Sequence, residues 1–316
     1  MKTKKKIWII SFLCVGAGVI LLILGMILGG LPGFYIDDQG LHSYADAAKK
    51  PAYVSGEKEL APFTSANIDL DYADLQIVPS DTFKIEYCME GRKKPVCTVD
   101  NGMLTLKEAD YKRVFSVDYF SFGSVFSDTD VPDSYVKLYV PKGTAFDSIQ
   151  ILNDDGDVQL AQLTADTLRI EADYGDVSLD EFEGTKIHAA LADGSLSIKN
   201  SKADQIEIAD DYGDITLKDT ECNTLDADLS DGDLTAGNLS CETADIENEY
   251  GDVSLRMAGE FKDYSFDLTT EYGDIQIPEY DVISGDDEAR CQVNGSSGKK
   301  VQIYCEDGDI EIFAGK

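Results

Sequence analysis

Apolar and polar residues alternate around a recurring glycine throughout the second half of the chain. Six successive copies of this glycine stand 19 residues apart, and two longer intervals of 22 and 35 residues follow. A fixed period of this kind is typical of stacked repeat proteins, whose terminal repeats often carry insertions. The recurring glycines are Gly156, Gly175, Gly194, Gly213, Gly232, Gly251, Gly273 and Gly308.

Aliphatic residues occupy fixed positions on both sides of each glycine. The second and fourth residues after it are apolar, and so are the fifth and seventh residues before it. Because successive side chains of a strand point to opposite faces, this spacing predicts a strand on either side, each with one buried face. The column five residues before the glycine is Ile151, Ile170, Ala189, Ile208, Ala227, Ile246, Leu268 and Ile303.

The repeat unit is therefore strand, glycine turn, strand. We expect the glycine to adopt a positive φ angle and the neighbouring aspartates to bond to turn amides. Large and small residues also exchange places, because Leu191 accompanies Ala189 and Leu229 accompanies Ala227, whereas the intervening units have isoleucine in place of the alanine. Close packing demands such reciprocity of side chains on successive layers, so neighbouring units are predicted to stack directly.

Two topologies fit this pattern. In a parallel β-solenoid each unit is one coil, whereas in an antiparallel β-meander each unit is a hairpin with an Asp-Gly loop. Tyr-Gly suits that loop less well. Cys222 and Cys241 occupy the same position in successive units, where stacking at about 4.8 Å would bring them within disulfide range. We predict an all-β ectodomain, with a parallel β-solenoid over residues 145–316 and the meander as the alternative.

Residues 61–144 are predicted to form an N-terminal β region that starts the array. Apolar residues from Ile68 to Ile77 match the repeat, with Ala73 in place of the glycine. An aromatic stretch at residues 111–127 interrupts the region, and it caps the open end of the solenoid, docks a partner or touches the membrane surface. Further strands are expected at 82–89, 95–99, 103–107 and 135–140.

A charge-free apolar run over residues 7–31 predicts an N-terminal transmembrane helix. At about 1.5 Å per residue the run can cross a hydrocarbon core of about 30 Å, and it lacks the small-x-small site of a cleaved signal peptide. Residues 1–6 are a basic tail, which the positive-inside rule keeps in the cytoplasm. The prediction is a single-pass cell-membrane protein with a tether over residues 32–60 and an extracellular ectodomain. Lipidation of Cys14 is a less favoured alternative, because Leu13 precedes it.

The composition limits the class of partner. The chain has 60 acidic and 27 basic residues, a net charge of −33, and four of its lysines precede the apolar run. Such a surface repels nucleic acid and anionic headgroups and attracts divalent cations and basic partners. Nucleic-acid binding is therefore excluded, and the partner is expected to be an envelope protein or a glycan.

Stacked aspartates after the glycines suggest a cation site. In a solenoid these carboxylates form one ladder, whose mutual repulsion is relieved by raised pKa values or by bound Ca²⁺. The alternative is that they are solvated turn formers, since Ser195 breaks the ladder. No other cofactor is expected. The candidate calcium ligands are Asp157, Asp176, Asp214, Asp233, Asp252 and Asp274.

Six cysteines of the ectodomain could form three local disulfides or remain free thiols. Catalytic machinery is not evident, because His188 is expected on the outward side of a strand, His42 lies in the tether, and no phosphate-binding loop is found. The protein is therefore not expected to be an enzyme. The disulfide candidates are Cys88 with Cys97, Cys222 with Cys241, and Cys291 with Cys305.

A basic N-terminus, one membrane helix and repeated Tyr-Gly-Asp-Val and Asp-Gly-Asp-Leu units resemble the bacterial putative-adhesin family of unknown function, which includes LiaG-like membrane-anchored proteins. The resemblance covers roughly residues 60–316. It implies a β-helical ectodomain at the cell envelope that offers an interaction surface. Alternatives are an accessory role in envelope-stress sensing and, less favoured, a carbohydrate-active β-helix enzyme with a deep cleft.

Overall fold

The computed structural model describes residues 15–16, 18, 20–21, 33–37, 40–43, 53–109, 115–118, 133–285 and 288–314. These residues fall into two units, and the smaller one contains an antiparallel sheet of β1 (Gly33–Asp37), β2 (Gly40–Ser43) and β9 (Phe115–Asp118). Most of the predicted transmembrane helix and aromatic stretch lies outside the described residues. Within the described part, no helix is both long and apolar enough to cross a membrane.

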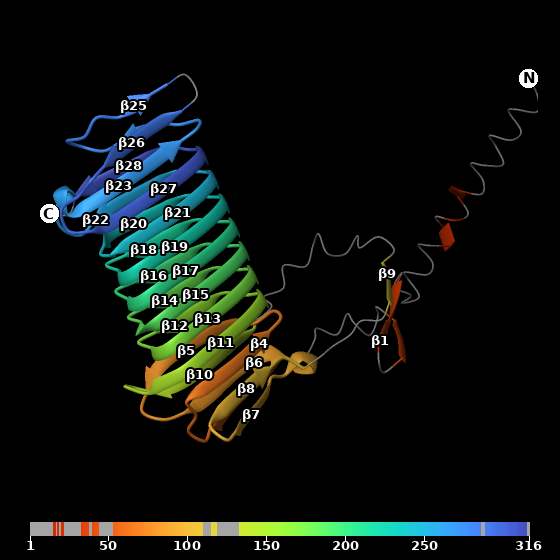
Figure 1. Cartoon of the computed structure of the whole chain (residues 1–316). Coiled ribbons are helices and arrows are strands. Elements are labelled where there is room, and N and C mark those ends of the chain that lie inside the picture. The colour runs from red at the N-terminus through yellow and green to blue at the C-terminus, as the bar shows by residue number, and fades with distance from the viewer. Residues whose placement is uncertain are drawn as a thin grey trace, which may run out of the picture. The chain divides into compact units, whose positions relative to one another are not determined.

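The larger unit is built from two long β-sheets, so the all-β prediction is confirmed (Figure 1). The first sheet has 12 strands, which are given next in the order in which they pair. They are β24 (Ile275–Gln276), β28 (Ile310–Ala314), β22 (Val253–Met257), β20 (Leu234–Leu239), β18 (Ile215–Lys218), β16 (Leu196–Lys199), β14 (Val177–Asp180), β12 (Val158–Ala161), β5 (Asp74–Ser80), β10 (Tyr135–Pro141), β6 (Lys84–Glu90) and β3 (Tyr53–Glu59).

Two short 3-10 helices, η1 (Gly91–Lys93) and η2 (Phe261–Asp263), lie between strands. The second sheet has 13 strands, most of them longer than the repeat strands of the first sheet, and they are given next in the order in which they pair. The strands are β25 (Ile283–Ser284), β26 (Ala289–Val293), β23 (Tyr264–Thr270), β27 (Lys299–Asp307), β21 (Thr243–Tyr250), β19 (Glu221–Asp231), β17 (Lys202–Tyr212), β15 (Glu183–Asp193), β13 (Thr164–Tyr174), β11 (Ala145–Asp155), β4 (Ser65–Leu70), β8 (Met103–Lys107) and β7 (Val96–Asp100).

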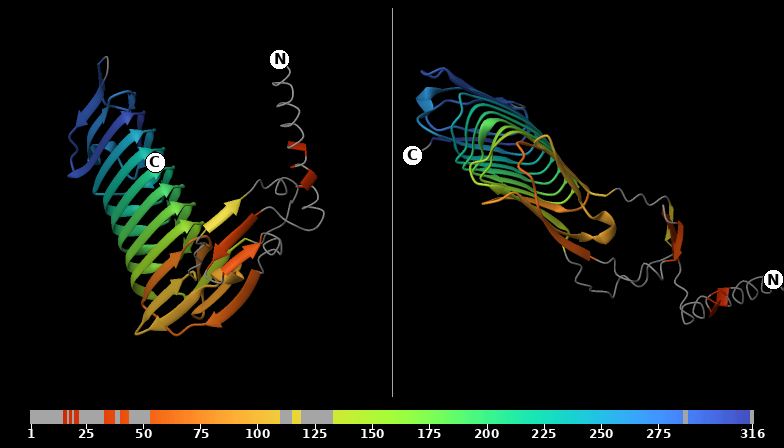
Figure 2. Two further views of the ribbon diagram at one scale, coloured as in Figure 1. Left: turned by 90° about the vertical axis from the view of Figure 1, so that its right-hand side faces the viewer. Right: turned by 90° about the horizontal axis from the view of Figure 1, so that it is seen from below.

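Each 19-residue unit contributes one long strand to the second sheet and one short strand to the first. Strand β13 pairs with β15 in parallel, with Ile170 opposite Ala189, and β14 pairs with β16 in parallel, with Val177 opposite Leu196. The strands on either side of a glycine thus belong to different sheets, and the units form a solenoid-like stack (Figure 2). The hairpin alternative is wrong, because the glycine turns carry the chain from one sheet to the other.

The core lies between the two sheets and consists of stacked aliphatic columns. Ile170, Ala189, Ile208 and Ala227 follow one another across adjacent strands, and each is at most 4% exposed. The column two residues later places Leu191 between Ala172 and Asp210. The predicted exchange of large and small residues is therefore a packing arrangement between successive coils.

In five successive coils the opposite turn contains a non-glycine residue in the left-handed region, with φ between 49° and 59°. Asparagine is one of the residues that tolerate this conformation best, but glutamine, glutamate and aspartate occur here as well, so no single residue type marks this turn along the chain. These residues are Gln162, Glu181, Asn200, Asp219 and Asn238.

The N-terminal β region continues the same two sheets. Strand β11 pairs in parallel with β4, and β12 with β5, so the prediction that the array begins near Ile68 is confirmed. The four further strands predicted between residues 82 and 140 are also present as β6, β7, β8 and β10. Strands β1, β2 and β3 lie within residues 32–60, for which the sequence predicts only a tether.

Chain order and spatial order differ at the C-terminal end. Strand β27 pairs in parallel with both β21 and β23, so the last long strand lies between two earlier ones. Strands β26 and β25 then close this end in antiparallel pairing, where Phe261, Phe266 and Tyr280 form an aromatic cluster with centroids 6.0 to 6.4 Å apart. These elements cover the edge that a parallel stack would otherwise expose.

Candidate functional site

The glycine turns are aligned along one edge of the stack, as the sequence predicted. An added Cβ on Gly232 would lie 1.8 Å from the carbonyl oxygen of Gly213, and Gly232 has a φ of 146°. Gly175, Gly194, Gly213 and Gly251 show the same positive φ and the same close approach to the glycine of the preceding coil. Only glycine fits, since any side chain would strain the backbone and strike a carbonyl group.

The aspartates after the glycines form a hydrogen-bonded ladder between coils. The amide of Asp233 donates to Oδ1 of Asp214 at 3.0 Å, and the amide of Asp252 donates to Oδ1 of Asp233 at 2.8 Å. The same contact links Asp74, Asp157, Asp176 and Ser195 in one run and Asp252, Asp309 and Asp274 in another. The predicted bonds to turn amides therefore exist, but each reaches the next coil.

The ladder gives the calcium hypothesis no direct support. One oxygen of each linking carboxylate already accepts an amide, and among the described residues no group of three or more His, Cys, Asp or Glu side chains could hold a metal ion. Burial is the main cause that raises the pKa of Asp74, the first carboxylate of the ladder, and that of Asp154, two residues before Gly156, whereas the charges of nearby carboxylates contribute less. These shifts therefore do not demonstrate repulsion between stacked carboxylates. Calcium binding stays a prediction.

Exposed tyrosines and aspartates alternate just before the glycines, in a row that we call the tyrosine rim. The tyrosine side chains are 51% to 62% exposed, and the aspartates between them are exposed as well. Tyr174 pairs in register with Asp155 on one side and Asp193 on the other. In spatial order the tyrosine rim is Tyr72, Asp155, Tyr174, Asp193, Tyr212, Asp231, Tyr250, Asp307 and Tyr272.

Tyrosine and aspartate alternate along the whole rim in space, although they do not alternate throughout in chain order. Along the chain Tyr250 is followed by Tyr272 and then by Asp307. Because β27 lies between β21 and β23, Asp307 pairs with Tyr250 and separates it from Tyr272. The sequence shows the exposed row only in part, since the order of the last two coils depends on pairing between distant segments.

Polar side chains three residues before the glycine support the turns from inside. Nδ2 of Asn248 donates to the carbonyl oxygens of Gly232 and Gly251, both at 3.0 Å, and Asn153 binds the carbonyls of Ala73 and Gly156. The same column contains Asp210, which is 3% exposed. Burial, then the carboxylates of Asp211, Asp214 and Asp193, raise its pKa to about 7, although the Tyr212 amide lowers it.

Among the residues that the structure describes, all six cysteines are free thiols. Cys222 and Cys241 lie in adjacent coils, as predicted, because the preceding residues Glu221 and Ser240 pair in parallel. Burial raises the pKa of each of these two thiols to about 12. They are therefore protonated and unreactive at neutral pH.

The other two disulfide predictions do not fit the sheet order. Cys291 is opposite Leu268 of β23 and Cys305 is opposite Thr270, so the whole strand β23 separates them. Two strand spacings amount to about 9.5 Å, beyond the reach of a disulfide. Cys88 and Cys97 belong to β6 and β7, which lie in different sheets.

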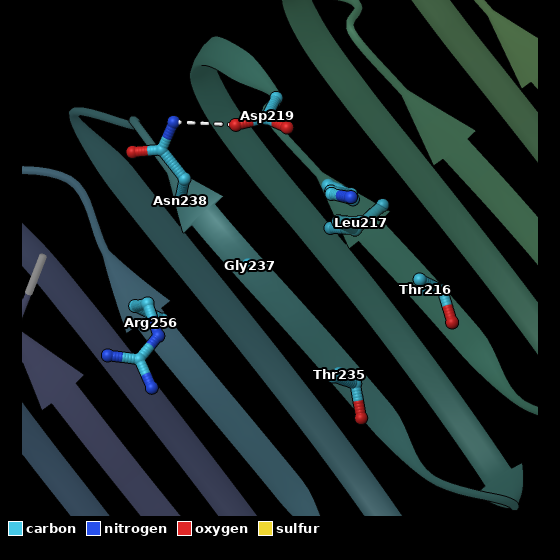
Figure 3. A pocket seen from close by; sticks show the side chains of 8 residues that line it. Thr216, Leu217, Asp219, Thr235, Gly237, Asn238 and Arg256 are labelled. Carbon is cyan, nitrogen blue, oxygen red and sulfur yellow. Dashed lines mark hydrogen bonds between the residues drawn. The ribbon is translucent and has the colours of Figure 1, made fainter.

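A shallow pocket lies on the outer face of the first sheet (Figure 3). Its volume is about 260 Å³. Gly237 has no side chain to fill this space, whereas the equivalent residues of the two neighbouring strands are the long side chains Lys218 and Arg256. Its one carboxylate is Asp219, whose Oδ1 accepts a hydrogen bond from Asn238 at 2.8 Å. A glycosidase requires two carboxylates across the bond to be cleaved.

His188 lies on the outer side of β15, as predicted. Its Nδ1 is 3.1 Å from Oε2 of Glu207, whose other oxygen is 2.7 Å from Nζ of Lys186. Both partners lower the pKa of Glu207, Lys186 more strongly. These three side chains form a polar surface group in which Lys186 and Glu207 are an ion pair.

Comparison with known proteins places the chain in one family. The model of the family described as Toastrack DUF4097 matches residues 63–313, which include the whole tyrosine rim. No curated protein matches the chain.

Several solved structures are distantly similar. A "putative adhesin" from Parabacteroides distasonis is 16% identical, with a TM-score of 0.43, over 83% of this chain and 98% of that one. A "putative adhesin" from Parabacteroides merdae is 15% identical, with a TM-score of 0.42, over 84% and 98%. A "putative lipid binding protein" from Parabacteroides distasonis is 13% identical, with a TM-score of 0.40, over 84% and 98%.

Proposed function

Because the chain belongs to the Toastrack DUF4097 family, we propose that it is a non-catalytic, adhesin-like binding protein of the cell envelope. Its binding surface is the tyrosine rim. The observation that carries this proposal is the unbroken spatial alternation of exposed tyrosine and exposed aspartate over nine coils.

The tyrosines of the rim have no evident role in folding. Their side chains are more than half exposed, and every second coil has aspartate at the same position. A coil therefore closes equally well without an aromatic residue there. Exposed aromatic side chains arranged in a row are typical of binding surfaces, where they supply large contact area at a low entropic cost.

Membrane anchoring is part of the proposal. The apolar run at residues 7–31 and the basic residues 1–6 support a single-pass anchor with the N-terminus in the cytoplasm and the ectodomain outside. Protease treatment of intact cells tests this orientation. The proposal expects loss of the ectodomain from intact cells, and protection of the ectodomain would contradict it.

Binding to envelope material tests the function itself. The full chain in detergent is incubated with isolated cell envelopes, alongside a variant carrying Tyr174→Ser, Tyr212→Ser and Tyr250→Ser. The variant keeps the charge and the core, because these side chains are exposed. We expect it to lose most of the binding while its circular dichroism is unchanged. The control is Lys199→Ser with Lys218→Ser on the outer face of the first sheet, which should bind like the wild type.

Equal binding by the tyrosine variant and the wild type would contradict the proposed function. Hydrolysis of an envelope polysaccharide by the purified chain would contradict its non-catalytic part. The pocket with the single carboxylate Asp219 supports the absence of such hydrolysis, since that chemistry needs a carboxylate pair.

A further inference from the structure

The tyrosine rim has a regular spacing that constrains its ligand, and the argument rests on the proposed function. Adjacent parallel strands lie about 4.8 Å apart, so tyrosines in alternate coils lie about 9.6 Å apart. From Tyr72 to Tyr272 the rim crosses eight strand spacings of about 4.8 Å, or about 38 Å. A ligand that contacts every tyrosine of the rim must therefore be extended, and a ligand with a matching repeat makes the same contact at each step.

Each aspartate of the rim lies between two tyrosines, which makes four equivalent slots. One slot, for example, is formed by Tyr174, Asp193 and Tyr212, and the next by Tyr212, Asp231 and Tyr250. A carboxylate flanked by aromatic rings favours a cation, because the charge is attracted both to the carboxylate and to the ring faces. The slots thus select lysine, arginine or another positively charged group.

The surroundings of the rim reinforce this preference. From the third residue before each glycine to the second residue after it, no coil has a lysine, arginine or histidine, and the same holds around Ala73. Two further rows of mostly acidic residues flank the rim, one directly after the glycine, interrupted by Ser195, and one two residues before it, interrupted by Ala192 and Ser230. An acidic or phosphate-bearing ligand would be repelled over the whole length of this edge.

The spacing distinguishes between conformations of a peptide ligand. A β-strand points side chains to one face every two residues, about 6.8 Å apart, which does not match the slots. A polyproline II helix has three residues per turn and rises about 3.1 Å per residue, so every third side chain recurs at about 9.3 Å. Twelve residues would then cover about 37 Å, which agrees with the length of the rim to about 1 Å.

From this match we propose that the tyrosine rim binds a basic, proline-rich segment in the polyproline II conformation, with a lysine or arginine at every third residue. The cations enter the aspartate slots, and proline rings pack against the tyrosines, as they do in the aromatic-lined grooves that recognise such helices. The partner is therefore a protein with a triplet-repeat segment.

Labelled peptides test the proposal with the full chain in detergent, using fluorescence anisotropy. One peptide repeats Pro-Pro-Lys, a second has the same composition with its lysines clustered, and a third repeats Pro-Pro-Glu. We expect the first to bind at least about tenfold more tightly than the second, and the third not to bind. The Tyr174→Ser, Tyr212→Ser, Tyr250→Ser variant, which keeps every charge, should lose the difference between the first two.

Three results would overturn the proposal. Equal affinity for the regular and clustered peptides would show attraction by charge alone. Undiminished preference in the tyrosine variant would place binding elsewhere. Displacement of cell envelopes from the rim by a neutral β-linked oligosaccharide, but not by the Pro-Pro-Lys peptide, would identify a glycan ligand. That last result would leave the proposed function intact, whereas envelope binding that ignores the tyrosines would contradict the function itself.

Discussion

Replacing Asp210 by asparagine should stabilise the protein, and by an amount that depends on pH. Asp210 occupies the inner column in which Asn153 and Asn248 donate hydrogen bonds to turn carbonyls. Oδ2 of Asp210 lies 3.3 Å from the position of a Cβ on Gly213, so the carboxyl group is close to the same turn. Within the described structure, neither carboxylate oxygen has a hydrogen-bond partner of good geometry. An asparagine there can donate as its counterparts do.

The magnitude follows from the pKa of Asp210, which burial raises from 3.8 to about 7. The folded state therefore holds a proton that the unfolded state releases between these two pH values. Over this window the contribution of Asp210 to the free energy of unfolding falls by about 1.4 kcal/mol per pH unit, or about 4 kcal/mol in total. Below pH 3.8 Asp210 is protonated in both the folded and the unfolded state, so it no longer lowers the free energy of unfolding.

Urea unfolding followed by far-ultraviolet circular dichroism measures this difference. Relative to wild type, Asp210→Asn should be nearly neutral at pH 4 and more stable by up to about 4 kcal/mol at pH 8. Asp226→Asn, at an exposed position of the next coil, controls for the removal of one negative charge. A constant difference between pH 4 and pH 8, or a destabilised asparagine variant, would refute the reasoning.

Three further predictions address the turn edge and the cysteines. Gly232→Ala should destabilise by about 3 kcal/mol or more, because its Cβ would strike a carbonyl at a positive φ, whereas Gly237→Ala, with open space around it, should be tolerated in the same thermal melt. Asp214→Ser should cost about 1 kcal/mol by removing the acceptor for the next amide, and a calcium titration of both proteins, followed by melting temperature, decides whether this ladder also binds the cation. Cys222 and Cys241 should not react with a thiol reagent at pH 8 until urea is added, and rapid reaction in the folded state would contradict their burial.

Local patterns predicted most of the coil. The column containing Ile170 and Ala189, the aligned glycines and the strands on either side could be derived from the sequence, because each depends on spacing within one 19-residue unit. The reciprocal packing of Leu191 and its neighbours was also foreseeable, since equivalent positions of adjacent units must share one volume.

Features that depend on distant pairing were not predictable. The insertion of β27 between β21 and β23 joins segments of similar alternating pattern, and nothing in that pattern specifies which strand is outermost. The error over Cys291 and Cys305 has the same origin, because a short loop suggested neighbours where β23 intervenes. The rim was missed as a complete row for this reason also.

The burial of Asp210 could have been predicted from the alternation along the strand. Asp210 stands three residues before its glycine, on the same strand face as the buried fifth and seventh positions, and Leu191 and Leu229 occupy the equivalent place in the adjacent coils. The position along the strand, rather than the acidic composition of the repeat, determines that this carboxylate is enclosed.

Cysteine pairs placed on the rim test the stacked arrangement most directly. Tyr250→Cys with Asp307→Cys joins positions that pair across adjacent strands, within the Cα separation that a disulfide allows. Tyr250→Cys with Tyr272→Cys joins positions two coils apart, about 9.6 Å, which a disulfide does not span. Oxidation followed by peptide mapping should give a disulfide in the first variant and none in the second. A disulfide in the second variant alone would contradict the order of the coils and, with it, the tyrosine rim.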